Sequence, residues 1–155
     1  MLYRPAVDAT CAAMPTLGER LVLESLRCWA ASRMDGGHPI VASRRLIAWR
    51  TSERVAALFV AWMNAVEEGR RRPIQIHCRR CRGASNDEQR LILAMGVASV
   101  DMELGETLLT PLLIDPGAVM ALARALGAAL AAGGLPLPAR ICGAPVRHGA
   151  NATRH

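Results

Sequence analysis

The chain has 155 residues, a length that fits a single domain, and its 52% of hydrophobic residues excludes a wholly disordered protein. Five residues are aromatic and 27 are alanine, a balance that favours helices over sheets. The formal net charge is +6, and all 19 cations are arginine, a bias that a genomic codon preference explains as well as selection does. No stretch is long and apolar enough to span a membrane, so a membrane is not expected as a partner.

The N-terminal segment is predicted to be a loosely ordered arm over residues 1–15, which contain two prolines and few regularly spaced hydrophobic residues. It lacks the basic and apolar regions of a secretion signal, and the five cysteines are an odd number. We therefore expect a cytoplasmic protein with reduced thiols. A single helical domain is expected over residues 16–142, followed by a disordered basic tail over residues 143–155.

Capping patterns and regular apolar spacing predict the first three helices. Thr16 followed by Glu19 matches a capping box, and the helix that they begin is expected to end at residues 35–37, an Asp-Gly-Gly sequence. A second, short helix is predicted over residues 40–49. The third is predicted over residues 52–69, because its apolar residues fall on one face.

Turn-forming residues divide the second half of the domain into shorter elements. Apolar and polar residues alternate over 74–78, which predicts a short extended segment that could pair with residues 135–142 as a two-stranded edge. Ser85 is expected to start a helix with Glu88 as its capping partner. Further helical pieces are predicted over residues 104–114 and 116–132. These patterns predict a mostly α fold, a compact bundle of about five helices with one extended segment.

Six arginines stand close together in a part of the chain that contains no acidic residue. The other 13 arginines equal the 13 acidic residues in number, so this cluster carries the whole net charge. Guanidinium groups suit bidentate contacts to carboxylates and phosphates. The cluster therefore predicts a binding site for an acidic protein surface or a nucleic-acid backbone. Its members are Arg70, Arg71, Arg72, Arg79, Arg80 and Arg82.

The most specific motif is the His-Cys-Arg-Arg-Cys sequence that begins at His77. A Cys-x-x-Cys turn can offer the thiolates of Cys78 and Cys81 to zinc, with His77 as a weaker candidate ligand, although a complete site needs further ligands. A redox interpretation is also open, because neighbouring arginines and a following helix N-terminus favour the thiolate. In a third interpretation, Cys78 packs as a small hydrophobic residue beside the isoleucines that precede it. No cofactor is expected, with zinc as the alternative.

Motifs for enzymatic catalysis are missing, since the chain has neither a glycine-rich phosphate loop nor a nucleophile elbow. We expect a small non-enzymatic cytoplasmic adaptor or regulatory protein that binds an acidic partner through the loop over residues 69–85. The alternatives are a regulator that binds nucleic-acid backbones through the same arginines, and a thiol or zinc switch at Cys78 and Cys81. The Ala-rich helix over residues 116–132 could also pack against a second copy of the chain.

Overall fold

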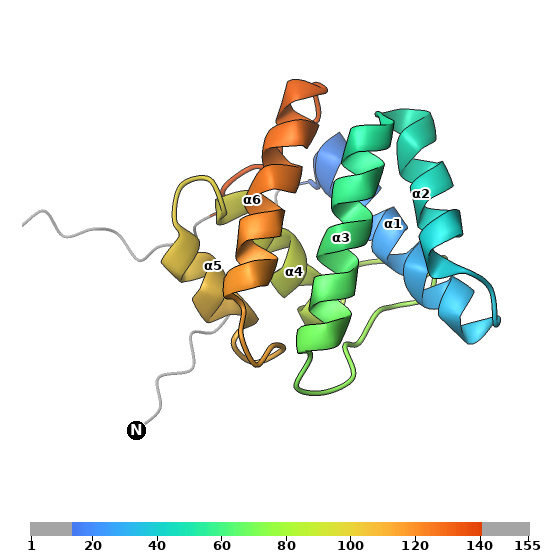
Figure 1. Ribbon diagram of the computed structural model, residues 1–155, viewed down its shortest axis with the longest axis horizontal. Coiled ribbons are helices and arrows are strands. Elements are labelled where there is room, and N and C mark those ends of the chain that lie inside the picture. The colour runs from blue at the N-terminus through green and yellow to red at the C-terminus, as the bar shows by residue number, and fades with distance from the viewer. Residues whose placement is uncertain (1–13, 141–155) are drawn as a thin grey trace, which may run out of the picture.

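The structure is a computed structural model that describes residues 14–140, and it folds these residues into six α-helices (Figure 1). The prediction of a mostly α bundle is confirmed, with six helices rather than about five. The predicted N-terminal arm, apart from its last two residues, and the predicted basic tail lie outside the described residues. The helices are α1 (Leu17–Met34), α2 (Pro39–Arg50), α3 (Glu53–Gly69), α4 (Asn86–Val97), α5 (Met102–Leu109) and α6 (Gly117–Ala132).

Two of the helices begin at the predicted capping boxes. At the start of α1, the Thr16 hydroxyl accepts from the Glu19 backbone N–H at 3.2 Å, and the Glu19 carboxylate accepts from the Thr16 N–H at 2.7 Å. Ser85 and Glu88 make the same reciprocal pair of bonds at the start of α4. Each box satisfies N–H groups that no residue within the helix can reach, which fixes where the helix begins.

The core lies where α3 packs between α2 and α6, while α1 packs against α2 and α4 and closes the bundle (Figure 1). The one-sided stripe predicted for α3 is buried here, and its largest members, Phe59 and Trp62, are each 1% exposed. The Phe59 ring also meets Trp29 of α1 edge-on, with 6.5 Å between ring centroids. Burying such side chains contributes about 1.5–3 kcal/mol each to the free energy of unfolding. The contact between Trp29 and Phe59 therefore joins α1 to α3.

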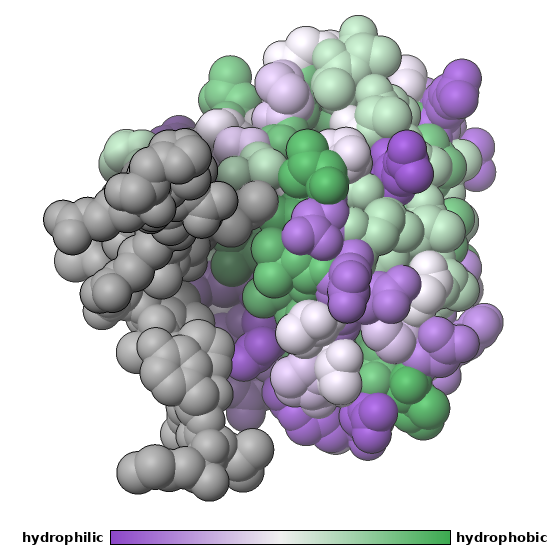
Figure 2. Space-filling model, turned by 90° about the vertical axis from the view of Figure 1, so that its left-hand side faces the viewer, coloured by the Kyte–Doolittle hydropathy of each residue, from purple (hydrophilic) through white to green (hydrophobic). Residues whose placement is uncertain are grey.

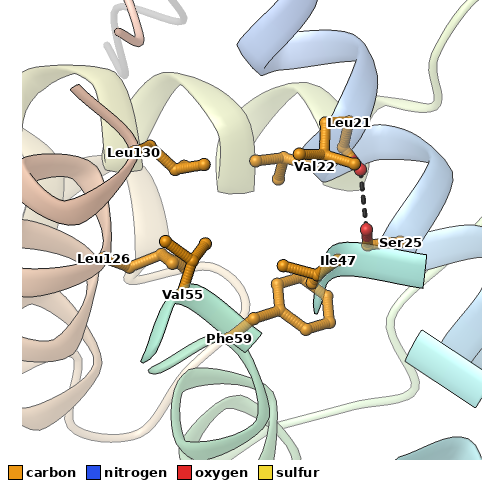
Figure 3. A pocket seen from close by; sticks show the side chains of 8 residues that line it. All are labelled: Leu21, Val22, Ser25, Ile47, Val55, Phe59, Leu126 and Leu130. Carbon is orange, nitrogen blue, oxygen red and sulfur yellow. Dashed lines mark hydrogen bonds between the residues drawn. The ribbon is translucent and has the colours of Figure 1, made fainter. Parts of the chain in front are cut away.

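An internal gap of about 10 Å³ lies between α1, α2, α3 and α6 (Figure 3). Its lining is apolar apart from Ser25, whose hydroxyl donates to the Leu21 carbonyl at 2.7 Å, the bond drawn as a dashed line. A buried water needs at least this much space and two or more polar partners. The gap is therefore a packing defect rather than a ligand site.

Two sequence predictions are wrong in the second half of the domain. Helix α5 covers Met102–Leu109 rather than 104–114, because Asp101 caps it and the chain turns before Pro111. Residues 74–78 belong to no helix or strand, and within the described residues they do not pair with the segment 135–140. That segment lies against α1 and α4 instead.

Two glycines explain this course of the C-terminal segment. A Cβ atom at Gly18 of α1 would lie 2.7 Å from the Leu135 carbonyl oxygen, and a Cβ at Gly96 of α4 would overlap the Pro138 carbonyl oxygen. Helix backbone without side chains at these two positions lets the segment approach closely, and Leu137 packs against the core. The single β-bridge of the described residues joins Arg70 to Leu113, at the start of the loop that follows α3.

The face on the left of Figure 1, where α5 and α6 lie, is turned toward the viewer in Figure 2. Apolar residues gather there beside the atoms drawn in grey, with polar residues around them. No helix within residues 14–140 combines the length and the hydropathy that crossing a membrane requires. Large exposed apolar side chains are spread over several elements: Met14, Leu17, Met34, Ile40, Val41, Trp49, Val100 and Ile114.

We predict that Gly96→Ala lowers the free energy of unfolding by about 1–3 kcal/mol, because the new methyl group must displace the backbone at Pro138. The matched control is Gly127→Ala in α6, where a Cβ would lie 3.7 Å from the nearest atom. That variant should be neutral or up to about 1 kcal/mol more stable, since alanine is the better helix former. Urea denaturation of both proteins measures the difference. Equal stabilities would contradict the position of the C-terminal segment against α4.

Candidate functional site

The candidate site is the loop between α3 and α4, residues 70–85, called the arginine loop below. Its first half is held by Asp87, whose side chain is 5% exposed. Arg72 donates to both carboxylate oxygens of Asp87, at 2.7 and 2.8 Å, and the Gln75 backbone N–H donates to the same carboxylate at 2.8 Å. Hydrogen bonds from Arg72 hold the pKa of Asp87 below its usual value despite its burial. Asp87 is therefore charged and fixes the loop to the first turn of α4.

A buried ion pair between Glu88 of α4 and Arg27 of α1 holds the second half. Arg27 Nε lies 2.9 Å from Glu88 Oε1 and its Nη2 lies 3.1 Å from Oε2, and the two side chains are 7% and 0% exposed. The same carboxylate accepts from the backbone N–H groups of Ser85 and His77, at 2.7 and 3.1 Å. Burial alone would raise the pKa of Glu88, but the hydrogen bonds from Arg27 and the backbone lower it below its usual value. Glu88 is thus both helix cap and counter-ion.

Arg27 also binds the backbone of the loop directly. Its Nη1 donates to the Cys81 carbonyl at 2.9 Å, and its Nη2 donates to the Gly83 carbonyl at 2.6 Å. Gly83 has a φ of +72°, a left-handed conformation that glycine adopts without strain. One guanidinium therefore joins α1, α4 and the arginine loop, and the loop conformation does not depend on solvent-exposed contacts alone.

Cys78 and Cys81 are joined by a disulfide at the tip of the loop, with their Cα atoms 5.3 Å apart. The Cys81 backbone N–H donates to the Cys78 carbonyl at 3.1 Å, so the four residues form a closed turn. Cys78 is exposed and Cys81 half-buried. The interpretation of Cys78 as a buried hydrophobic residue is therefore wrong, although Ile74 and Ile76 do pack against the core. The disulfide also differs from the reduced thiols that the sequence led us to expect.

The zinc interpretation gains no further ligand within residues 14–140. No three His, Cys, Asp or Glu side chains of this range lie close enough together to hold one metal ion. His77 Nδ1 lies 4.0 Å from Glu88 Oε2, and Glu88 is already occupied by Arg27. A disulfide has no thiolate to offer, so zinc could bind only after reduction and with ligands from outside the described residues. Zinc at Cys78 and Cys81 stays a prediction.

The structure divides the arginine cluster into two groups. Arg72 is bound to Asp87, and Arg71 Nε donates to the Leu113 carbonyl at 2.7 Å, so both help to hold the loop. The others are exposed, and within residues 14–140 their guanidinium groups make no hydrogen bond or salt bridge. Three of these lie at the disulfide turn and are called the tip arginines: Arg79, Arg80 and Arg82.

Sequence reasoning missed Arg27, the residue that positions the site. Its signal was a charged residue flanked by the buried apolar side chains of Leu26, Cys28 and Trp29. A buried charge in such a run requires a counter-ion. The counter-ion is Glu88, which lies 61 residues further along the chain, so the sequence around Arg27 does not identify it.

A second depression lies between the α1–α2 turn and α3. Its acidic group is Glu67, whose Oε1 accepts from the Trp29 indole N–H at 2.8 Å and from Arg33. The charges there satisfy each other, so the depression offers less to a ligand than the tip arginines.

Comparison with family models, curated proteins and solved structures finds no match to this chain. The function is therefore argued from the arginine loop itself.

We predict that Arg27→Met lowers the free energy of unfolding by about 3–5 kcal/mol, because it leaves the Glu88 carboxylate buried without its counter-ion. The double variant Arg27→Met/Glu88→Gln should lose less than the sum of the two single variants, since the partners are coupled. Arg44→Met is the control, as Arg44 and Glu53 form an exposed pair worth at most about 1 kcal/mol. Urea denaturation of the four variants measures these free energies of unfolding. A loss no larger for Arg27→Met than for Arg44→Met would refute the role of Arg27.

The lowered pKa values of Glu19, Asp87 and Glu88 predict an acid-sensitive fold. Each carboxylate binds protons more weakly in the folded chain, so its contribution is complete above the unfolded pKa, about 4. The contribution is lost as the pH falls through the lower, folded pKa. The melting temperature should therefore drop between about pH 4.5 and pH 2. Glu88→Gln should flatten this dependence, and thermal melts across that range measure it; parallel curves for both proteins would contradict the assignment.

Proposed function

We propose that the chain is a small non-enzymatic cytoplasmic adaptor or regulatory protein, and that its arginine loop docks on an acidic protein surface. One observation carries the proposal. The three tip arginines lie within four residues of one another, exposed and without an acidic partner in residues 14–140, on a loop that buried ion pairs hold in place.

The ion pairs that hold the arginine loop in place favour a docking role for the tip arginines over a role in solubility alone. Arg27 and Asp87 fix the backbone on both sides of the tip, so the tip arginines are presented from a defined backbone. A surface that is ordered before binding loses less conformational entropy when the partner binds. Guanidinium groups make paired hydrogen bonds to carboxylates, which adds orientation to charge attraction. Both features match a partner that carries two or three closely spaced Asp or Glu side chains.

Nucleic-acid backbone binding is the alternative use of the same arginines. Binding through phosphates alone draws its affinity from the number of phosphates that the protein neutralises, and the tip supplies only three guanidinium groups. The loop contains no Phe, Tyr or Trp, the side chains on which bases stack most often. These two features favour the acidic protein. Self-association through residues 116–132 is a separate alternative, and it would use the face of α6 opposite Val119 and Leu126, which are buried within the domain.

The proposal predicts that Arg79→Glu/Arg80→Glu/Arg82→Glu lowers the affinity for an acidic probe by about tenfold or more without changing the melting temperature. The probe is fluorescent poly-glutamate, with binding followed by anisotropy at 50 and 200 mM salt, roughly the range over which such contacts weaken. The matched control, Arg45→Glu/Arg54→Glu/Arg124→Glu, changes the net charge equally at three exposed arginines elsewhere. Equal losses in both variants would show that net charge, not the loop, binds the probe.

A labelled 20-base-pair duplex, a length of about two helical turns, is measured in parallel. Binding tighter than that of poly-glutamate, with a log–log salt slope near roughly −3, would favour the nucleic-acid alternative over the acidic protein. Light scattering of the unmodified chain reports whether a second copy binds instead. The proposal fails if neither anionic probe binds at low salt.

A further inference from the structure

We infer that Cys78 and Cys81 are a redox-active pair, which exchanges with a dithiol reductant while the domain stays folded. The inference rests on three observations at the loop tip. The two cysteines form a disulfide, the first of them is exposed, and the turn that they close contains only Arg79 and Arg80. It goes beyond the docking role and holds whether or not the acidic partner exists.

Opening the disulfide leaves the rest of the loop in place, because the contacts that hold the loop involve no sulfur. On one side, Asp87 binds Arg72, and the Ser85 hydroxyl donates to the Gln75 carbonyl at 2.5 Å. On the other side, Arg27 binds the carbonyls of Cys81 and Gly83. A bridge across four residues also restricts the unfolded chain little. The disulfide is therefore not what keeps the domain folded.

The burial of the two cysteines gives the exchange a direction. Cys78 is exposed, whereas Cys81 is half-buried and its carbonyl is held by Arg27. An incoming thiolate therefore reaches the Sγ of Cys78, and Cys81 is the leaving group. The tip arginines lie within two residues of Cys81 in sequence, and their positive charge favours its departure as a thiolate. The lone buried cysteine of the described residues, Cys28, is enclosed in α1 and takes no part.

The exchange balances in two steps with a dithiol as reductant. In the first step, one thiolate of the reductant bonds to Cys78 Sγ, the Cys78–Cys81 bond breaks, and Cys81 takes the electron pair and then a proton. In the second step, the other thiolate of the reductant attacks its own sulfur in the mixed disulfide and releases Cys78, which takes a second proton. The reductant leaves as a cyclic disulfide. Two electrons and two protons have then moved to the protein.

Reduction also changes the site of the proposed function, and this step rests on that function. In the oxidised form the closed turn fixes the backbone of Arg79 and Arg80. In the reduced form the two arginines are free to adopt other conformations, although Arg82 stays next to the held Cys81 carbonyl. We therefore expect the oxidised form to bind the acidic probe more tightly. In a reducing compartment a disulfide is usually transient and redox-sensing, which is the behaviour inferred here.

The first experiment uses the full chain with Cys11→Ser and Cys142→Ser, so that only Cys28, Cys78 and Cys81 remain. The oxidised protein is incubated with dithiothreitol, alkylated without denaturant and weighed by intact mass spectrometry. Two alkyl groups per chain, at an unchanged melting temperature, are expected. The inference is overturned if alkylation appears only when the protein is denatured.

The second experiment tests the direction. Cys81→Ser and Cys78→Ser are added separately to that background, and each protein is treated with oxidised glutathione. The protein that retains Cys78 should form the mixed disulfide about tenfold faster, because Cys78 is the more exposed residue. Equal rates, or a faster reaction at Cys81, overturn the assignment of Cys78 as the attacked residue. The protein that retains both cysteines serves as control and should recover its internal disulfide.

The third experiment separates this inference from the docking proposal. Binding of poly-glutamate is compared between the oxidised and reduced forms, and we expect about a threefold or larger loss on reduction. Equal affinities contradict the link between the disulfide and docking. If poly-glutamate binds neither form, the docking proposal fails, whereas the alkylation and glutathione results still decide the thiol chemistry.

Discussion

The rest of the structure around the arginine loop depends on the ion pair between Arg27 and Glu88. Two buried charges lose several kcal/mol of hydration each, so such a pair is stable only when its remaining hydrogen-bonding groups are satisfied. Here the Glu88 carboxylate accepts from Arg27 and from the backbone of Ser85 and His77, while Arg27 also donates to two loop carbonyls. The pair therefore specifies a geometry more than it adds stability. It determines where an otherwise irregular segment crosses α1 and α4.

This requirement divides the positive charge of the cluster between two roles. Asp87 neutralises Arg72 of the cluster, and Glu88 neutralises Arg27, which lies outside the cluster in α1, so that both guanidinium groups help to hold the loop. Their acids are then no longer available to the tip. The tip arginines have no acidic partner within residues 14–140, and Asp87 and Glu88 are already paired and buried. Within the cluster, Arg71 and Arg72 therefore hold the loop, whereas the tip arginines are exposed.

The helices were predictable because their signals are local. The capping boxes at Thr16 and Ser85 and the apolar stripe of α3 each lie within a few turns of chain, and all three are present. The start of α5 was not predicted although Asp101 caps it, because Gly105, a residue type that usually interrupts helices, lies inside this one. The contacts of the C-terminal segment and of Arg27 could not be predicted, since they join residues far apart in sequence. The candidate loop was found from its composition, whereas the residues that hold it were not.

The disulfide lies in the part of the arginine loop that carries exposed charge, between the parts that the ion pairs hold. A loop that is held only by its disulfide loses its conformation on reduction, and any function then ends with unfolding. Here the ion pairs at Arg27 and Asp87 hold both sides of the turn, so the sulfur chemistry is confined to four residues that contain two of the tip arginines. A change of oxidation state can then alter the presentation of charge without a change in the core. Exposure of Cys78 and support at Cys81 are both needed for this, and they come from the loop's attachment to α1 rather than from the Cys-x-x-Cys spacing alone.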